Sequence, residues 1–243
     1  MKKIIITFIA LCSLFVAKAT PLKDSLTGEK VLQKMYKKYK GNWYKNFTFT
    51  QTTETFKKDS LVKTDTWYES IVFPDYFRIS IGAAENGNAV IYNKDSVFQI
   101  RKSKLVNKSL RTDDLTFLLG GMYFLPYDTV KSKILKEGYD YTKAYETTYN
   151  GKAVYVIGAN NENEKVSQLF IEKERLIVVR FIKYIGKTKQ EAIFDGHQKV
   201  GKAYTETIVS FYINDAMLQK EKYYDCKFNT TIDMAIFDPY QFK

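Results

Sequence analysis

Cysteine and histidine are almost absent from this chain, which has two cysteines and one histidine among its 243 residues. Cys12 lies in an N-terminal run that we expect to be removed, so a mature chain keeps Cys226 alone and forms no intramolecular disulfide. A zinc site built from histidine and cysteine ligands of one chain is therefore excluded. His197 lies in a polar segment typical of a turn, and Cys226 lies in an apparent strand, where a buried structural thiol is expected. Neither residue predicts catalysis.

The recognisable signatures of hydrolases and phosphate-binding loops are also missing, because the sequence contains no G-x-S-x-G, H-E-x-x-H or G-x-x-x-x-G-K-[S/T] motif. Paired carboxylates could still support hydrolysis. The candidate acids are scattered over different predicted elements: Glu54, Glu69, Asp113, Asp114 and Glu146. Glu172 and Glu174 lie in a predicted hairpin turn, where solvated charge is expected. We therefore predict no enzyme activity, no catalytic residues, no metal and no cofactor, with an unrecognised hydrolase as an alternative.

The N-terminus has the three parts of a secretory signal peptide. Lys2 and Lys3 precede an apolar run over residues 4–16, and Ala17-Lys18-Ala19 supplies the small-x-small cleavage pattern. The run is too short to span a bilayer, and no second one follows. We predict a cleaved leader over residues 1–19 and one exported, soluble domain over residues 20–243. Nucleic acid is not an expected partner, because export removes the chain from it.

Basic residues exceed acidic ones, and the formal net charge of +11 falls to +8 when the leader is removed. The densest basic cluster lies near the mature N-terminus and contains Lys34, Lys37, Lys38 and Lys40. It predicts either transient contact with an anionic lipid surface or an acidic partner, or simply a solvated helix face.

Hydrophobic periodicity predicts one helix followed by many strands. Thr27 is a plausible N-cap for a helix that ends at Gly41 and has an apolar stripe of Val31, Leu32, Met35, Tyr36 and Tyr39. After this helix the period changes to two. The first alternating runs begin near Phe47 and Trp67, and Pro74-Asp75 interrupts the second before it resumes at Phe77.

Short turns separate the later strands. The turn signals are Asn93-Lys94-Asp95-Ser96, Asn150-Gly151 and Glu172-Lys173-Glu174-Arg175, and two long strands are predicted over residues 202–213 and 218–228. Strands joined in this way form an antiparallel meander. Residues 112–125 break the pattern with a short apolar helix, ended by Gly120-Gly121, and a further helix is predicted over residues 128–136. The fold class is mainly β (α+β), in one domain.

Several segments, in order along the chain, resemble the periplasmic lipoprotein-carrier family, the LolA/LolB-like half-barrels. Asn46-Phe47-Thr48-Phe49-Thr50-Gln51 is similar to the family's first strand, and Val72-Phe73-Pro74-Asp75-Tyr76-Phe77-Arg78 to its second. Residues 89–100 and 170–176 resemble two of its hairpins, residues 115–119 its short apolar helix, and residues 228–239 its C-terminal ending. The resemblance covers nearly the whole mature chain.

This resemblance implies a single antiparallel half-barrel, an incomplete β-barrel with an N-terminal helix and a short helical lid insertion, whose apolar face holds acyl chains. The candidate inward row is Phe47, Phe49, Trp67, Ile71, Phe73, Phe77, Ile79, Phe98, Ile100, Val154 and Val156. The candidate lid is Leu115, Leu118, Leu119, Met122 and Phe124. Arg78 is a possible latch for the lid, or points outward between Phe77 and Ile79. From periodicity alone, the inward row equally fits an ordinary packed core and the lid a plain buried helix.

The resemblance implies a carrier in the periplasm of a Gram-negative bacterium that sequesters lipid or lipoprotein acyl chains, in outer-membrane lipoprotein sorting, with transient contact to membrane proteins. One alternative is an envelope-stress or lipid sensor of the same fold. Another is an interaction protein whose half-barrel is fully packed and binds nothing small.

Overall fold

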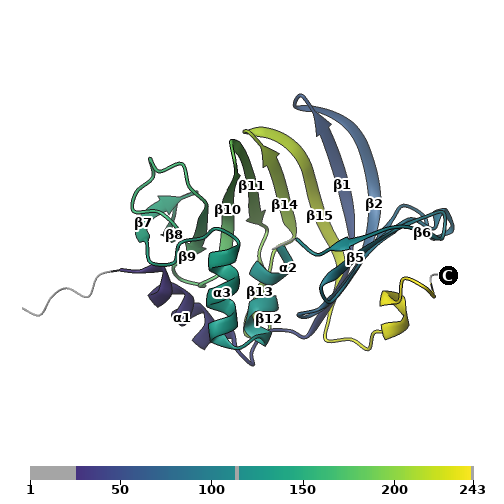
Figure 1. The fold of residues 1–243 in the computed structure, drawn as a ribbon, viewed down its shortest axis with the longest axis horizontal. Helices are drawn as coiled ribbons and strands as arrows, with labels where there is room; N and C mark the ends of the chain where they lie inside the picture. Colours follow the sequence, from purple (N-terminus) through teal and green to yellow (C-terminus); the bar gives the residue numbers. More distant parts are fainter. Residues whose placement is uncertain (1–25, 113–114, 242–243) are drawn as a thin grey trace, which may run out of the picture.

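The computed structural model describes residues 26–112 and 115–241, and its main feature is one antiparallel sheet of thirteen strands (Figure 1). The strand order is β6-β5-β4-β3-β2-β1-β15-β14-β11-β10-β9-β8-β7, and β12 and β13 form a small separate pair. The mainly β prediction is confirmed. The predicted leader lies outside the described residues. None of the helices in the described part combines the length and apolar character needed to cross a bilayer.

Consecutive strands are joined mostly by tight turns, as the turn signals predict. The first six strands are β1 (Asn46–Lys57), β2 (Ser60–Val72), β3 (Tyr76–Ile81), β4 (Ala89–Asn93), β5 (Ser96–Arg101) and β6 (Lys104–Leu110). The others are β7 (Ala144–Tyr149), β8 (Lys152–Ile157), β9 (Gln168–Glu172), β10 (Val178–Ile185), β11 (Thr188–Asp195), β12 (Gln198–Val200), β13 (Ala203–Thr205), β14 (Ile208–Ile213) and β15 (Ala216–Phe228).

Two strand predictions need correction. Pro74-Asp75 does not interrupt one strand but reverses the chain between β2 and β3, which pair with each other. The long strand predicted over residues 202–213 is divided into β13 and β14, with Glu206 and Thr207 between them. Both errors have one cause, since alternation continues across a reversal or a break when the flanking residues keep the same phase.

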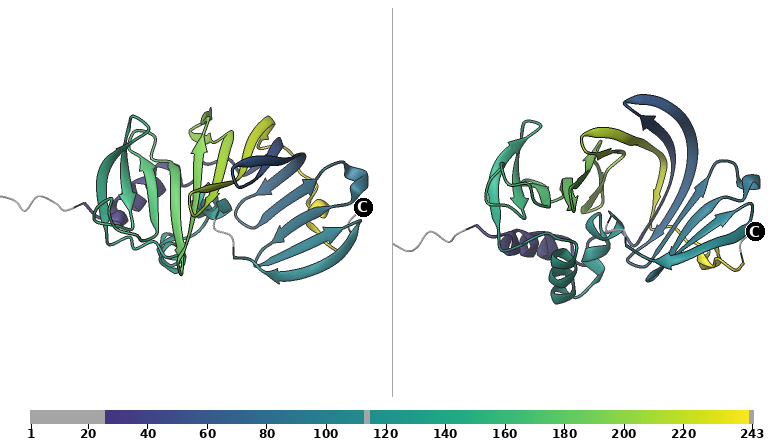
Figure 2. Two further views of the ribbon diagram at one scale, coloured as in Figure 1. Left: turned by 90° about the horizontal axis from the view of Figure 1, so that it is seen from above. Right: turned by 45° about the horizontal axis from the view of Figure 1, so that its top comes forward.

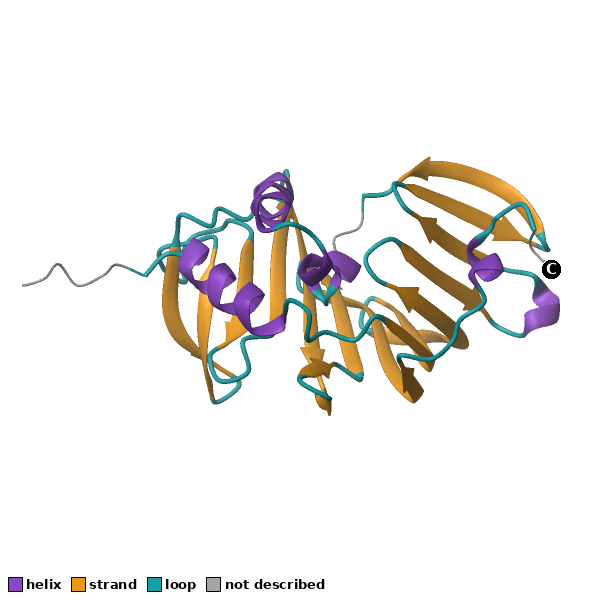
Figure 3. Ribbon diagram, turned by 90° about the horizontal axis from the view of Figure 1, so that it is seen from below, coloured by secondary structure: helices purple, strands orange, loops and turns teal. Residues whose placement is uncertain are grey.

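The sheet curls into an open half-barrel, and the helices α1 (Gly28–Tyr39), α2 (Leu115–Leu118) and α3 (Tyr127–Lys136) lie on its concave side (Figures 2 and 3). Directly opposed residues of neighbouring strands share a face. The register therefore traces the concave face from Gln219 through Phe211, Ala192, Phe181 and Leu169 to Ile157. A sheet with one long apolar face must be covered, and these helices cover it.

Helix α1 forms as its sequence predicts. The Thr27 side chain accepts a hydrogen bond from the backbone N–H of Lys30 at 3.3 Å, which caps the first turn. The predicted apolar stripe is buried, and it packs with Ile157 and Leu169 in the main core. The basic cluster lies partly on this helix, where Lys38 Nζ donates to the Arg175 carbonyl at 2.8 Å.

We expect Gly28→Ala to destabilise the protein, although alanine is the better helix former by about 1 kcal/mol. A Cβ at this position would lie 2.6 Å from Ile157 Cγ2 and 2.8 Å from the Tyr141 carbonyl oxygen, and a backbone carbonyl cannot move away cheaply. Overpacking of this kind costs about 1–3 kcal/mol. Urea denaturation would measure the loss, with Gln33→Ala on the exposed side of α1 as the matched control. An unchanged midpoint for Gly28→Ala would contradict the packing of α1 on β8.

The helical insertion lies across the middle of the concave face. It contains α2, the 3₁₀ turn η2 (Gly121–Phe124) and α3. Gly120 has φ +150° and sits against Trp43, whose Nε1 would lie 2.2 Å from a Cβ, so only glycine fits there. Leu118 and Met122 anchor the insertion in the main core, with exposures of 2% and 1%. The predicted cap region at Asp113 and Asp114 lies outside the described residues.

Candidate functional site

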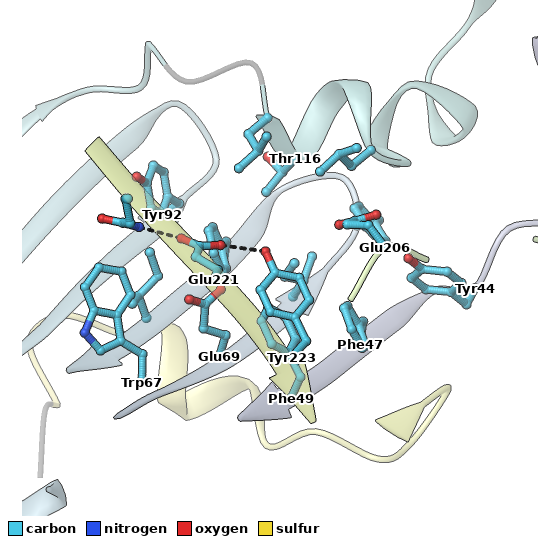
Figure 4. A pocket seen from close by; sticks show the side chains of 17 residues that line it. Tyr44, Phe47, Phe49, Trp67, Glu69, Tyr92, Thr116, Glu206, Glu221 and Tyr223 are labelled. Carbon is cyan, nitrogen blue, oxygen red and sulfur yellow. Dashed lines mark hydrogen bonds between the residues drawn. The ribbon is translucent and has the colours of Figure 1, made fainter. Parts of the chain in front are cut away.

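A cavity of about 180 Å³ lies on the concave face between α2 and the strands β1, β2, β3 and β15. Seven members of the predicted inward row line it: Phe47, Phe49, Trp67, Ile71, Phe73, Phe77 and Ile79. They meet because of the strand register, which pairs Phe47 with Ile71 and Ile71 with Phe77. Tyr44, Tyr92 and Tyr223, which sequence reasoning missed, complete the aromatic wall (Figure 4).

The predicted lid residues divide between the cavity and the core. Leu115 and Leu119 line the cavity, as does Thr116. Leu118 and Met122 instead point into the main core. Phe124 is partly exposed and stacks on Phe73 with 5.7 Å between ring centroids. The insertion therefore covers the cavity with one side and is held by the other.

Four residues of the predicted inward row are not in this cavity. Phe98 and Ile100 pack under Phe237 on the convex face, where the C-terminal 3₁₀ turn η3 (Met234–Phe237) covers them. Val154 and Val156 are fully buried in the main core and do not line this cavity. Their inclusion in the row is corrected. Period two orders the residues of one strand but does not say which phase faces inward, and here both faces of the sheet are partly covered.

Arg78 is not a latch on the lid. It lies on β3 between the cavity residues Phe77 and Ile79, so its side chain is on the opposite face. There its Nη1 donates to the Ile236 carbonyl at 2.9 Å and its Nε to Ser80 Oγ at 3.0 Å. The structure assigns Arg78 to the C-terminal segment instead.

Three carboxylates that the sequence showed as unrelated, or did not single out, converge in the cavity. Glu69 comes from β2, Glu206 from the break before β14 and Glu221 from β15, with exposures of only 6–8%. Glu221 accepts hydrogen bonds from Tyr223 Oη at 2.7 Å and Gln219 Nε2 at 2.6 Å (Figure 4). Of the acids named as candidates from the sequence, Glu69 lies in this cavity, and its neighbours Glu206 and Glu221 were not among those candidates. The alternation of residues in β2 and β15 could have indicated this, because it places Glu69 on the same face as Trp67 and Glu221 on the same face as Tyr223.

Burial dominates the titration of these acids. It raises the pKa of Glu69 well above its ordinary value, and the neighbouring negative charge of Glu221 raises it further. Burial raises the pKa of Glu206 to about 8, against the effect of a hydrogen bond from its own backbone. The pKa of Glu221 is also raised by burial, although the bonds from Tyr223, Gln219 and Gln51 oppose the shift. Glu206, whose pKa is raised to about 8, therefore keeps its proton at neutral pH.

A larger groove of about 750 Å³ adjoins the cavity, and the two share Leu115 and Gln219. Phe181, Ile185, Phe211 and Leu218 give the groove apolar walls, and Lys136 and Lys183 lie among its polar residues. Its volume is within the range of sites that bind small molecules. Together the two spaces form a path along the concave face.

Glu172 is buried rather than solvated, which corrects the prediction for its turn. Its exposure is 3%, and its carboxylate accepts from Arg175 Nε at 2.6 Å and Lys152 Nζ at 3.0 Å. Hydrogen bonding to Arg175 holds its pKa below the ordinary value. Nearby, burial and the charge of Arg175 lower the pKa of His197 to about 4, so this imidazole is neutral at physiological pH.

Cys226 is half-buried beside the aromatic cluster of Phe47 and Tyr44, as a free thiol whose pKa is raised by burial. Within residues 26–112 and 115–241, no group of three histidine, cysteine, aspartate or glutamate side chains is placed to hold a metal ion.

No family model matches this chain, and no curated protein matches it in sequence. Among solved structures, a DUF1329 family protein from Desulfovibrio piger aligns with a TM-score of 0.62 at 14% identity, over 89% of this chain and 98% of its own. A LolA superfamily protein from Nitrosomonas europaea aligns with a TM-score of 0.56 at 10% identity, over 88% of this chain and 98% of its own. At such identities the likeness shows the fold alone, and the fold is LolA-like.

Proposed function

We propose that this protein is a carrier that sequesters lipid or lipoprotein acyl chains non-covalently on the concave face of its half-barrel. The observation that carries the proposal is the aromatic cavity under Leu115 and Leu119, which continues into the 750 Å³ groove. Concave, mostly apolar spaces with a few polar groups are the usual form of small-molecule sites. The LolA-like fold supports the same class of cargo.

Burial of the acyl chain of the ligand supplies the affinity. Each methylene that leaves water contributes about 0.8 kcal/mol, so about ten buried methylenes correspond to the roughly 8 kcal/mol of micromolar binding, and further burial has to offset the cost of association. Displacing the α2 side of the insertion offsets part of this gain, which keeps binding reversible. Reversible sequestration needs no covalent step, and we therefore propose a binding protein rather than an enzyme.

The place of action that we propose is the periplasm of a Gram-negative bacterium, in the sorting of outer-membrane lipoproteins. The basis is the signal-peptide pattern of residues 1–19 together with the LolA-like fold. Mass spectrometry of the exported protein, purified without detergent, would show whether fatty-acyl species co-purify in stoichiometric amounts. A protein that is empty and also ignores added dodecanol would contradict the carrier proposal.

We expect Ile79→Trp to weaken dodecanol binding at least about 10-fold, which corresponds to 1.4 kcal/mol. Ile79 lines the 180 Å³ cavity from β3, and an indole there would occupy space that the ligand needs. Isothermal titration calorimetry would measure the affinity. Leu61→Trp is the matched control, because Leu61 is 54% exposed on β2. Equal affinities for the two variants would place the ligand elsewhere.

A further inference from the structure

The acid cluster of the cavity consists of Glu69 and Glu221, and of these two only Glu221 receives hydrogen bonds from the described residues. Glu69 is 6% exposed, and no hydrogen bond or ion pair reaches its carboxyl group from the described residues. A buried carboxylate without a donor or a cation is costly, so Glu69 binds its proton more tightly than usual, and its pKa is raised. A ligand that brings donors and a positive charge into the cavity would stabilise the ionised form of Glu69.

The polar groups around the cluster do not supply a donor to Glu69. Gln51 Nε2 donates to Thr53 Oγ1 at 2.7 Å, and the side chains of Gln51, Gln219 and Tyr223 all bond to Glu221 rather than to Glu69. Trp67 Nε1, on the same strand as Glu69, is itself buried without a partner in the described chain, so it does not satisfy the acid.

Other titratable groups face the cluster from the elements packed against the cavity. Glu206 and Tyr44 lie beyond the Tyr223 ring, and Tyr92 faces from β4 (Figure 4). The cavity residues of β3 and of the helical insertion are not titratable: Phe77, Ile79, Leu115, Thr116 and Leu119. Arg111 lies over the Tyr92 ring at 5.1 Å, donates a hydrogen bond to Thr116 Oγ1 and lines the groove. The charge that acts on Glu69 is the negative one of Glu221.

We propose that this cavity receives the head of a single-chain amphiphile that carries a primary ammonium group, with Glu69 and Glu221 as its acceptors. The inference rests on the proposed function and specifies the chemical class of its ligand. An ammonium group brings three N–H donors and a positive charge to Glu69, which has neither a donor nor a cation among the described residues. The rings of Phe49, Trp67 and Tyr223 around it add favourable cation–π contacts.

Size favours an organic cation with a tail over a bare ion. A cavity of 150 Å³ holds one benzene molecule, so the space of about 180 Å³ is sufficient for a head and the first few carbons. The rest of the chain can pass Leu115 and Gln219 into the adjoining groove. The ammonium group thus lies beside Glu69 and Glu221, and the alkyl tail lies along the apolar residues of the groove.

Calorimetry with dodecylamine and dodecanol tests this inference, because the two ligands have the same tail and differ in the head. We expect dodecylamine to bind at least about 10-fold more tightly at pH 7.5. Because the pKa of Glu69 is raised by burial and by the neighbouring charge of Glu221, binding of the ammonium group should favour its carboxylate and release protons, measurable in buffers of different ionisation enthalpy. Dodecanol should release none.

The double variant Glu69→Gln/Glu221→Gln should lose both the amine preference and the proton release while retaining dodecanol binding. Glu54→Gln is the control, since Glu54 is on the convex face of β1, opposite Lys220. Dodecanol binding without an amine preference would overturn the inference and leave the carrier proposal intact. An amine preference that persists in the double variant would also overturn it. Failure of both ligands to bind would instead contradict the proposed function.

Discussion

Glu206→Gln is expected to stabilise the protein by roughly 4 kcal/mol at pH 8 and to have little effect at pH 4. Glu206 lines the cavity with 8% exposure, and burial raises its pKa to about 8 from an ordinary 4.5. Glutamine keeps the size of the side chain and an acceptor for the backbone N–H, but it cannot become a buried anion. The substitution therefore removes the cost of charging this site.

The sign of the pH dependence follows from the direction of the shift. A carboxyl group whose pKa is raised in the folded state binds its proton more tightly there than in the unfolded chain. Its contribution to stability is complete below pH 4.5 and is lost as the pH rises through about 8. The wild-type protein should therefore lose stability over this interval, and Glu206→Gln should lose less.

Urea denaturation at pH 4, 6 and 8 would measure the difference in the free energy of unfolding. Glu162→Gln makes the same chemical change at an exposed position and serves as the control. A stabilisation of the same size at every pH would show that the effect comes from packing rather than from ionisation. A destabilisation at pH 8 would mean that the Glu206 carboxylate has a cationic partner in solution.

The fold was largely predictable because its signals are local. Thr27 caps α1 as predicted, the Asn150-Gly151 turn joins β7 to β8, and residues 128–136 lie within α3. Alternation in β1 and β2 placed Phe47, Phe49 and Trp67 on one face, and the register brought them into one cavity. Each of these inferences needs only a capping residue, a turn or one strand.

The rest of the site depends on contacts between distant segments, which periodicity does not encode. The C-terminal segment from Met234 to Phe237 covers the convex face, so Phe98 and Ile100 are buried there although they face away from the cavity. Arg78 binds the same segment, because its Nη1 donates to the Ile236 carbonyl. Glu69 and Glu221 meet only because both flank β1, a relation between residues about 150 positions apart. The phase of a strand and the partner of an acid are both tertiary properties.

Glu172→Ala is expected to destabilise the protein by about 2–3 kcal/mol at pH 7, in contrast with the cavity acids. Glu172 is 3% exposed and binds both Arg175 and Lys152. Arg175 in turn holds the end of α1, because its carbonyl accepts from Tyr39 Oη and from Lys38 Nζ. Removal of the carboxylate leaves the guanidinium, 16% exposed, without its main partner.

The pH dependence of this loss has the opposite sign to that of Glu206. Since bonding to Arg175 lowers the pKa of Glu172, its contribution is present above the ordinary pKa near 4.5 and disappears as the pH falls through the lower folded value. The stabilities of the wild-type protein and Glu172→Ala should therefore converge in acid.

Glu174→Ala, on an exposed residue of the same turn, is the control in thermal denaturation at pH 3 and pH 7. A loss for Glu172→Ala that is independent of pH would assign the effect to packing, and no loss at pH 7 would mean that the ion pair is not formed. Opposite slopes at Glu206 and Glu172 would separate the two roles of buried acids in this chain: Glu172 is bonded to Arg175 and Lys152 and stabilises the fold, whereas Glu206 has no ion-pair partner among the described residues and destabilises the folded state when it ionises.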